Sequence, residues 1–164
     1  MADYNYKQPD RPRYGQTGPQ RQGGGYSSGG NNNSNETAES KFGQLNYEPR
    51  WITEGATPEL VAYAEEAGKF MAAKKLTSSK FRSIYGEIKR IQMGEFEKEK
   101  PSFYLLKPKM AYALGRDAGN EGLKLFKLVF DRASNEVSDK KSYLNFCNFI
   151  EAILAYHKAY GGKD

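Results

Sequence analysis

The residue types that most often carry covalent or metal chemistry are scarce in this chain. The 164-residue sequence holds one cysteine, Cys147, and one histidine, His157, ten positions apart in an apolar segment. Ten residues of helix separate two side chains by about 15 Å of rise and about 80° of rotation, so the pair is expected to share neither a metal ion nor a proton. Cys147 is expected to pack as a small core residue. His157 is expected to pack near the end of its helix and the unpaired carbonyls there.

The acidic and glycine-rich stretches also lack the spacing of a catalytic site. Glu65 and Glu66 are adjacent on a helix and diverge, and the glutamates of the 95–101 stretch lie among lysines. The Gly23–Gly25 run lacks both the following Lys-Ser/Thr and the flanking strand of a phosphate-binding P-loop. We therefore expect a protein that is not an enzyme and that needs no metal or other cofactor.

A basic face is predicted on the helix that begins at Thr77 or Ser78. Its cations flank an apolar stripe and recur on adjacent turns: Lys80, Arg82, Lys89 and Arg90. Gly86 lies between Arg82 and Lys89, where a missing side chain would let a sugar–phosphate backbone approach the helix closely. This pattern suits contact with a polyanion.

A second basic face is predicted on the helix around residues 106–115. Lys109, Tyr112 and Arg116 recur at i, i+3 and i+7, which joins an aromatic platform to two charges. For each residue, the alternative is an ordinary solvated helix face. Two such faces with few acids between them, Glu87 being the exception, favour a surface that contacts phosphate and sugar without base-specific readout.

Hydrophobic periodicity predicts that five helices position these side chains within residues 47–164. Their approximate ranges are 58–71, 78–91, 106–114, 120–133 and 139–157. Thr57 and Asn120 have the residue types of N-caps, and Pro58 suits a first helical position. Proline is costly deeper inside a helix, so Pro108 is expected in a first turn.

The last predicted helix is apolar on most of its sides, which is typical of a central helix. Glu95–Pro101 is expected to form a charged connector, and no segment alternates with the period of a strand. The predicted fold class is therefore all-α: a compact bundle of about five helices, large enough for a real core.

Residues 1–46 differ in kind from the rest and are predicted to form a disordered Gly/Asn/Gln/Tyr-rich arm. No Val, Ile or Phe occurs before Phe42, so this segment has little apolar surface to offset the cost of ordering its backbone. The arm is interpreted as a solubilising tail, or as an Arg–Gly–Tyr segment that engages single-stranded RNA. Of the net charge of +5, 19 basic against 15 acidic residues place +4 on residues 51–164.

Three blocks of the sequence together resemble a known family. They are KLTSSKFRSIYGEIKRI at 75–91, LKPKMAYALGR at 106–116 and FCNFIEAILAYHK at 146–158. In this order they resemble the small helical subunit of type III-A CRISPR effector (Csm) complexes. The arm lies outside the resemblance.

The resemblance implies a non-catalytic protein of antiviral defence, several copies of which stack beside the subunits that grip the CRISPR RNA. It implies as partners the CRISPR RNA, the target RNA, the backbone and large subunits and further copies of the chain, in the cytoplasm and without a membrane. By analogy, the RNA-binding residues are Lys75, Lys80, Arg82, Lys89, Arg90, Lys107, Lys109, Tyr112 and Arg116. The alternatives are the small subunit of a type III-B complex, or a helical protein–protein scaffold that does not bind RNA.

Overall fold

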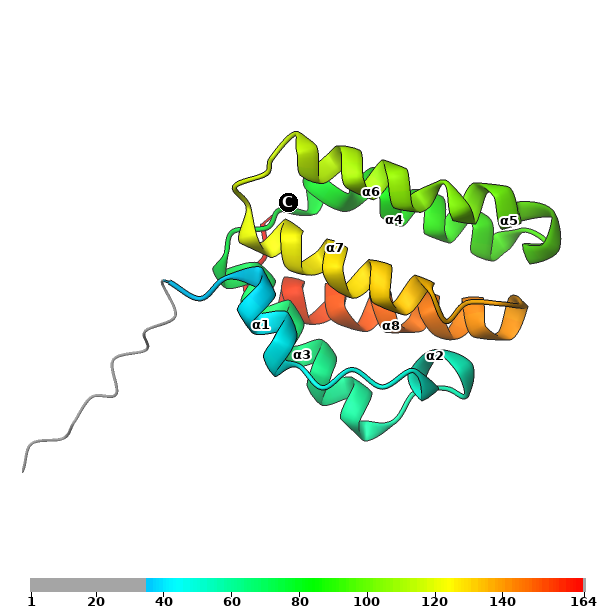
Figure 1. The fold of residues 1–164 in the computed structure, drawn as a ribbon, viewed down its shortest axis with the longest axis horizontal. Coiled ribbons are helices and arrows are strands. Elements are labelled where there is room, and N and C mark those ends of the chain that lie inside the picture. Colours follow the sequence, from blue (N-terminus) through cyan, green and yellow to red (C-terminus); the bar gives the residue numbers. More distant parts are fainter. Residues whose placement is uncertain (1–34, 164) are drawn as a thin grey trace, which may run out of the picture. The chain divides into compact units, whose positions relative to one another are not determined.

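The computed structural model describes residues 35–163. Over these residues the chain forms eight α-helices and no β-strand, which confirms the all-α prediction (Figure 1). The helices are α1 (Ala38–Gln44), α2 (Arg50–Thr53), α3 (Pro58–Ala73), α4 (Ser78–Met93), α5 (Phe96–Tyr104), α6 (Leu106–Gly115), α7 (Glu121–Ser134) and α8 (Lys140–Ala159).

The predicted helix starts are confirmed, and at α3, α7 and α8 a side-chain cap determines the start. The side chain of Thr57 accepts a hydrogen bond from the Leu60 amide, and that of Asn120 accepts one from the Leu123 amide. At the start of α8, Asp139 and Ser142 form a reciprocal capping box, which satisfies two otherwise unpaired amides. Pro108 lies in the first turn of α6, as expected.

The helices of residues 35–163 lie in three layers. In Figure 1, α4 runs antiparallel to α5 and α6 in one layer, α7 and α8 lie in the middle, and α1, α2 and α3 form the third. α8 packs against helices of both outer layers, including α3 and α4. The prediction that the last helix is central is therefore confirmed.

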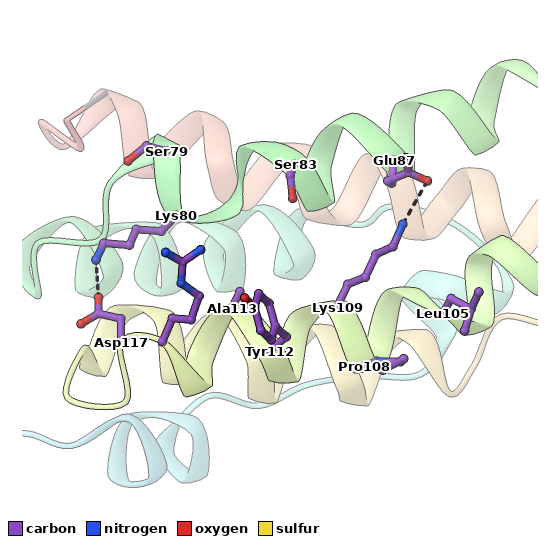
Figure 2. Close-up of a pocket in the computed structure, with 11 residues that line it drawn as sticks. Ser79, Lys80, Ser83, Glu87, Leu105, Pro108, Lys109, Tyr112, Ala113 and Asp117 are labelled. Atoms are coloured by element: carbon purple, nitrogen blue, oxygen red, sulfur yellow. Dashed lines mark hydrogen bonds and ion pairs between the residues drawn. The ribbon is translucent and has the colours of Figure 1, made fainter.

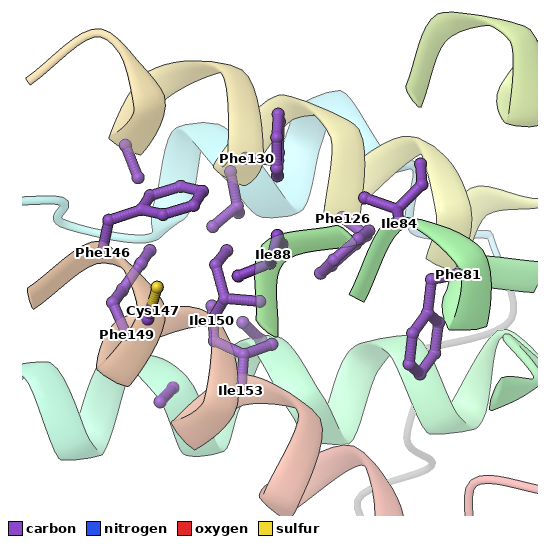
Figure 3. Close-up of a cluster of buried hydrophobic side chains, with 14 of the residues drawn as sticks. Phe81, Ile84, Ile88, Phe126, Phe130, Phe146, Cys147, Phe149, Ile150 and Ile153 are labelled. Carbon is purple, nitrogen blue, oxygen red and sulfur yellow. The ribbon is translucent and has the colours of Figure 1, made fainter. Parts of the chain in front are cut away.

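The core gathers large side chains of α8 between the outer layers. Phe146, Phe149 and Ile150 are fully buried. Phe146 packs against Phe130 of α7, and Ile150 lies near Ile88 of α4 (Figure 3). The ring of Phe149 packs on the other side, against Trp51 of α2 and Tyr63 of α3. Cys147 is buried among them, and this burial raises the pKa of its thiol to about 11. The prediction of Cys147 as a core residue is confirmed.

The glycine at position 68 lets α3 and α8 cross at close range. A Cβ atom there would lie 2.6 Å from the backbone nitrogen of His157 and 2.7 Å from the carbonyl oxygen of Ile153. A larger residue at this position would force the backbone of α3 or α8 to move. The close packing of the two helices therefore depends on glycine at position 68.

The predicted connector at Glu95–Pro101 is wrong, since residues 96–104 form helix α5. Phe96 and Phe103 lie seven residues apart on one face, are buried, and pack against the ring of Tyr143. The charged residues between them occupy the outer face. Two apolar positions in a nine-residue helix gave too little periodicity to stand out from the charges.

The predicted boundary of the arm at residue 46 is wrong for residues 38–44, which form helix α1. Ala38 is fully buried, and Phe42 and Leu45 pack against the core. Thr37 caps the helix through its side chain. Because α1 is short and has a small residue at its buried end, its apolar content is low, and composition alone placed it with the arm. Residues 1–34 of the predicted arm lie outside the described residues.

Candidate nucleic-acid interface

An open groove of about 1000 Å³ runs between α4 and α6; we call it the α4–α6 groove (Figure 2). Its lining residues are Ser79, Lys80, Ser83, Glu87, Leu105, Pro108, Lys109, Tyr112, Ala113, Arg116 and Asp117. Helical spacing produces it. The stripe of α4 that holds Ile84 and Ile88 is buried, and this turns the face with Ser79, Ser83 and Glu87 toward α6.

Four of the nine predicted RNA-binding residues meet in this groove. Lys80 comes from α4, while Lys109, Tyr112 and Arg116 come from α6 and its end. Tyr112 is 69% exposed, which makes it accessible for stacking. The guanidinium carbon of Arg116 lies 5.9 Å from the centre of the Tyr112 ring. The predicted combination of an aromatic platform with a charge is thus present in one place.

Two carboxylates share the groove with these cations. Nζ of Lys80 lies 2.6 Å from Oδ2 of Asp117, and Nζ of Lys109 lies 3.5 Å from Oε2 of Glu87. Figure 2 shows the two ion pairs near opposite ends of the groove, with Tyr112 between them. Three cations and two acids leave the groove with a net charge of +1. Sequence reasoning noted Glu87 but missed Asp117, which lies one residue beyond the basic stretch of α6.

Lys89 and Arg90 do not line the groove and are held by other acids. Lys89 donates a 2.8 Å hydrogen bond to Glu151 of α8, and this bond raises the pKa of the lysine. Arg90 pairs with Glu99 at 3.0 Å and with Glu87 at 3.3 Å, and the bond to Glu99 is the main cause of its raised pKa. Lys89 and Arg90 therefore lie apart from Lys80 in the structure, and their role as RNA-binding residues stays a prediction.

Arg82 lines a smaller hollow between α4 and α8. This hollow has a volume of about 350 Å³ and includes Phe81, Tyr85 and Leu154. Within residues 35–163, Arg82 forms no ion pair. The position of Gly86 is open, because a Cβ atom added there would meet no atom within 4 Å. The outer face of α4 is therefore accessible around Arg82.

The two remaining predicted residues line neither the α4–α6 groove nor the hollow beside Arg82. Lys107 donates to the side-chain oxygen of Asn135, just after α7, over 2.5 Å. Lys75 lies between α3 and α4 with a positive φ of 60°, and its carbonyl accepts a hydrogen bond from Asn120. The nine predicted residues therefore do not form one face.

The candidate chemical groups lie apart in the structure. Cys147 and His157 are both buried. The ring of His157 packs against Gly162, just after α8, as predicted, but the carbonyl that it contacts belongs to Leu76 and not to its own helix. No three His, Cys, Asp or Glu residues of the described part lie close enough to hold a metal ion.

In residues 35–163, no helix has the length and apolar character needed to cross a bilayer.

Comparison with known proteins shows which family the chain resembles. A family model described as Csm2 Type III-A matches residues 54–163, a range that includes both walls of the α4–α6 groove. Over 59 residues the chain is 36% identical to the "CRISPR system Cms protein Csm2" of Streptococcus thermophilus. That alignment covers 36% of this chain and 48% of the relative, so the chain spans about half the length of the curated protein that it matches. No solved structure is similar enough to count as a match.

Proposed function

Because this chain belongs to the Csm2 family of type III-A CRISPR systems, we propose that it is a non-catalytic small subunit of a type III-A ribonucleoprotein in antiviral defence. In this proposal several copies stack side by side in the cytoplasm and bind the backbone of the guide–target RNA without sequence specificity. Its partners are the CRISPR RNA, the target RNA, the backbone and large subunits and further copies of the chain. The family favours a type III-A complex over the type III-B alternative.

The observation that carries RNA binding is the pairing of Arg116 with Tyr112 in the α4–α6 groove. Arginine contacts phosphate through a fixed fork of donors, and an exposed aromatic ring supports a base or a sugar. Lys80, Lys109 and the hydroxyl groups of Ser79 and Ser83 line the same groove, and each of these side chains can donate to phosphate oxygens. Nothing in this set reads base edges in a defined order.

The placement of the reactive side chains supports a non-catalytic role. Cys147 and His157 are each 1% exposed, so a substrate in the α4–α6 groove or in the hollow between α4 and α8 does not reach them. Stacking between copies is supported by exposed apolar side chains near the junction of α5 and α6. Tyr104 is 63% exposed and Leu105 is 56% exposed, and both are suited to a protein contact.

The test is the affinity of the purified protein for RNA duplexes of unrelated sequence, measured over a series of salt concentrations. Arg116→Ala is expected to weaken binding several-fold, equally for all sequences, and to reduce the log–log salt slope by roughly 1. Tyr112→Ala is expected to weaken binding, and Tyr112→Phe to retain it. Arg50→Ala on α2 is the matched control, since it removes the same charge from a helix that takes no part in the groove.

Two outcomes would contradict the proposal. Equal affinities for the Arg116→Ala and Arg50→Ala variants would show that the groove is not the RNA face, and would favour a scaffold that does not bind RNA. A changed sequence preference would show that bases are being read. Co-purification of CRISPR RNA and the other subunits, from cells that express the whole locus, tests membership of the complex and distinguishes type III-A partners from type III-B partners.

A further inference from the structure

Both lysines of the α4–α6 groove are already occupied by carboxylates of the same groove. Lys80 on α4 reaches across to Asp117 at the end of α6, and Lys109 on α6 reaches across to Glu87 on α4 (Figure 2). Each ion pair therefore bridges the groove from one wall to the other. An incoming phosphate meets these two lysines with their charge already compensated.

Arg116 differs from the lysines. Its guanidinium lies over the ring of Tyr112, and within residues 35–163 it forms no ion pair. It is the one cation of the described groove lining that is available to a phosphate without displacing an acid. A single free charge attracts a polyanion only weakly. To bind more tightly, the polyanion must also displace the carboxylates from Lys80 and Lys109.

The two acids also differ from each other. Glu87 pairs with Arg90 at 3.3 Å as well as with Lys109, so it keeps a cationic partner when Lys109 turns to a phosphate. Asp117 pairs with Lys80 alone among the described residues. Displacing Asp117 therefore leaves a carboxylate without a partner, which is the costlier of the two exchanges.

We propose that Asp117 and Glu87 act as internal competitors for the lysines of the α4–α6 groove, so that RNA binds by exchanging two internal ion pairs for phosphate contacts. This inference rests on the proposed function of the groove as an RNA face. Because the pairs are solvent-exposed and individually weak, several phosphates that arrive together displace them. An isolated anion gains too little to do so. The groove is thereby selective for a backbone with closely spaced phosphates over an isolated anion.

The test compares Asp117→Asn and Glu87→Gln with a matched control, Glu54→Gln, which removes the same charge at the end of α2. Affinity for an RNA duplex is measured over a series of salt concentrations. Asp117→Asn is expected to bind about threefold to fivefold more tightly than Glu54→Gln, and Glu87→Gln to show a smaller gain. The salt slope is expected to steepen for Asp117→Asn, because a displaced carboxylate no longer takes up a cation on binding. Affinity equal to that of Glu54→Gln would overturn the inference.

A further variant separates competition from a loosened contact between α4 and α6. Lys80→Met breaks the same ion pair from its other side. If loosening were the cause of tighter binding, Lys80→Met would also bind more tightly, and this would overturn the inference; competition instead leaves its affinity unchanged or lower. Arg116→Ala is measured in parallel. If it weakens binding while Asp117→Asn matches its control, only the competition is wrong, whereas no effect of Arg116→Ala refutes the proposed RNA face itself.

Discussion

Nε2 of His157, near the end of α8, lies 2.7 Å from the carbonyl oxygen of Leu76, in the connection between α3 and α4. A carbonyl only accepts, so the imidazole donates. The ring is buried, with the ring of Phe81 against it at 5.7 Å between centroids. A second contact lies nearby: the carbonyl of Lys163, six residues after His157, accepts a hydrogen bond from the amide of Ser78, two residues after Leu76. The residues after α8 are thus tied to the start of α4, the helix that forms one wall of the groove.

The first prediction concerns Gly162, which leaves room for that ring. A Cβ atom at this position would lie 2.2 Å from Cε1 of His157, so Gly162→Ala forces the ring or the chain end to move. We expect a loss of about 1–3 kcal/mol in the free energy of unfolding, measured in urea. Gly115→Ala is the control, because its Cβ atom would meet nothing within 4 Å. Equal stability of the two variants would contradict the close packing.

The second prediction concerns the centre of the core. Phe146 is fully buried and lies against Phe130 and Phe103, with ring centroids 5.4 Å and 5.9 Å away. Phe146→Ala should lower the free energy of unfolding by about 3–5 kcal/mol, since it leaves a cavity that the surrounding rings fill only in part. Tyr112→Ala, which truncates an exposed aromatic residue, should change it by less than about 0.5 kcal/mol. A small effect at Phe146 would mean that α8 is not central.

The third prediction concerns acid stability. Asp139 accepts hydrogen bonds from the amide and hydroxyl of Ser142, and these bonds hold the pKa of its carboxyl below the ordinary value of 3.8. A lowered pKa in the folded state stabilises the fold above the ordinary value, and this contribution is lost as the pH falls through the lowered pKa. Asparagine also caps helices, so Asp139→Asn should be nearly as stable as the unmodified protein at neutral pH.

The measurement for Asp139 is a series of thermal melts from pH 5 downward. Below the ordinary pKa, the unmodified protein should lose stability more steeply than Asp139→Asn. Parallel curves for the two proteins would show that the carboxylate form of the cap contributes nothing. Glu54→Gln, which removes one exposed acid, serves as the control for a change in net charge.

The parts of the fold that the sequence predicted are those decided within a few residues. The cap of α7 needs only Asn120 and the amide three residues on, and the buried stripe of α4, from Phe81 to Ile91, repeats over about three turns. Helix α5 was missed because it offers only two buried aromatic residues among charges. Helix α1 was missed because its buried surface is small and lies beside a glycine-rich segment.

The sequence predicted the basic residues of the candidate site but not the acidic residues with which they form ion pairs. Lys80 meets Asp117 across 37 residues, and Lys89 meets Glu151 across 62. Helical spacing reports which side chains share one face of one helix, and it carries no information on which acid of another helix lies opposite. The separation of Lys89 and Arg90 from the groove, and the low net charge within it, follow only from how the helices pack.

The last prediction concerns the N-terminal segment and where it becomes part of the fold. Residues 1–34 contain no Val, Ile, Leu or Phe, so their deletion is expected to leave the helicity and stability of the remainder unchanged. Deletion of residues 1–45 also removes α1. The buried Ala38, whose amide donates to Glu121 over 2.6 Å, would be lost together with Phe42 and Leu45.

We expect the longer deletion to lower the free energy of unfolding by about 2–4 kcal/mol. A fully buried large apolar side chain contributes roughly 1.5–3 kcal/mol, and Phe42 and Leu45 are half-buried. The deletion also removes the hydrogen bond from the Ala38 amide to Glu121. The pKa of Glu121 is lowered chiefly by its hydrogen bond with Lys124 and then by this amide. Circular dichroism and urea unfolding of both truncated proteins measure the difference. Because the α4–α6 groove lies between Ser79 and Asp117, the shorter deletion should retain RNA affinity within about twofold, any loss reflecting stacking by its tyrosines. Abolished RNA binding with helicity intact would place the RNA face on residues 1–34 instead.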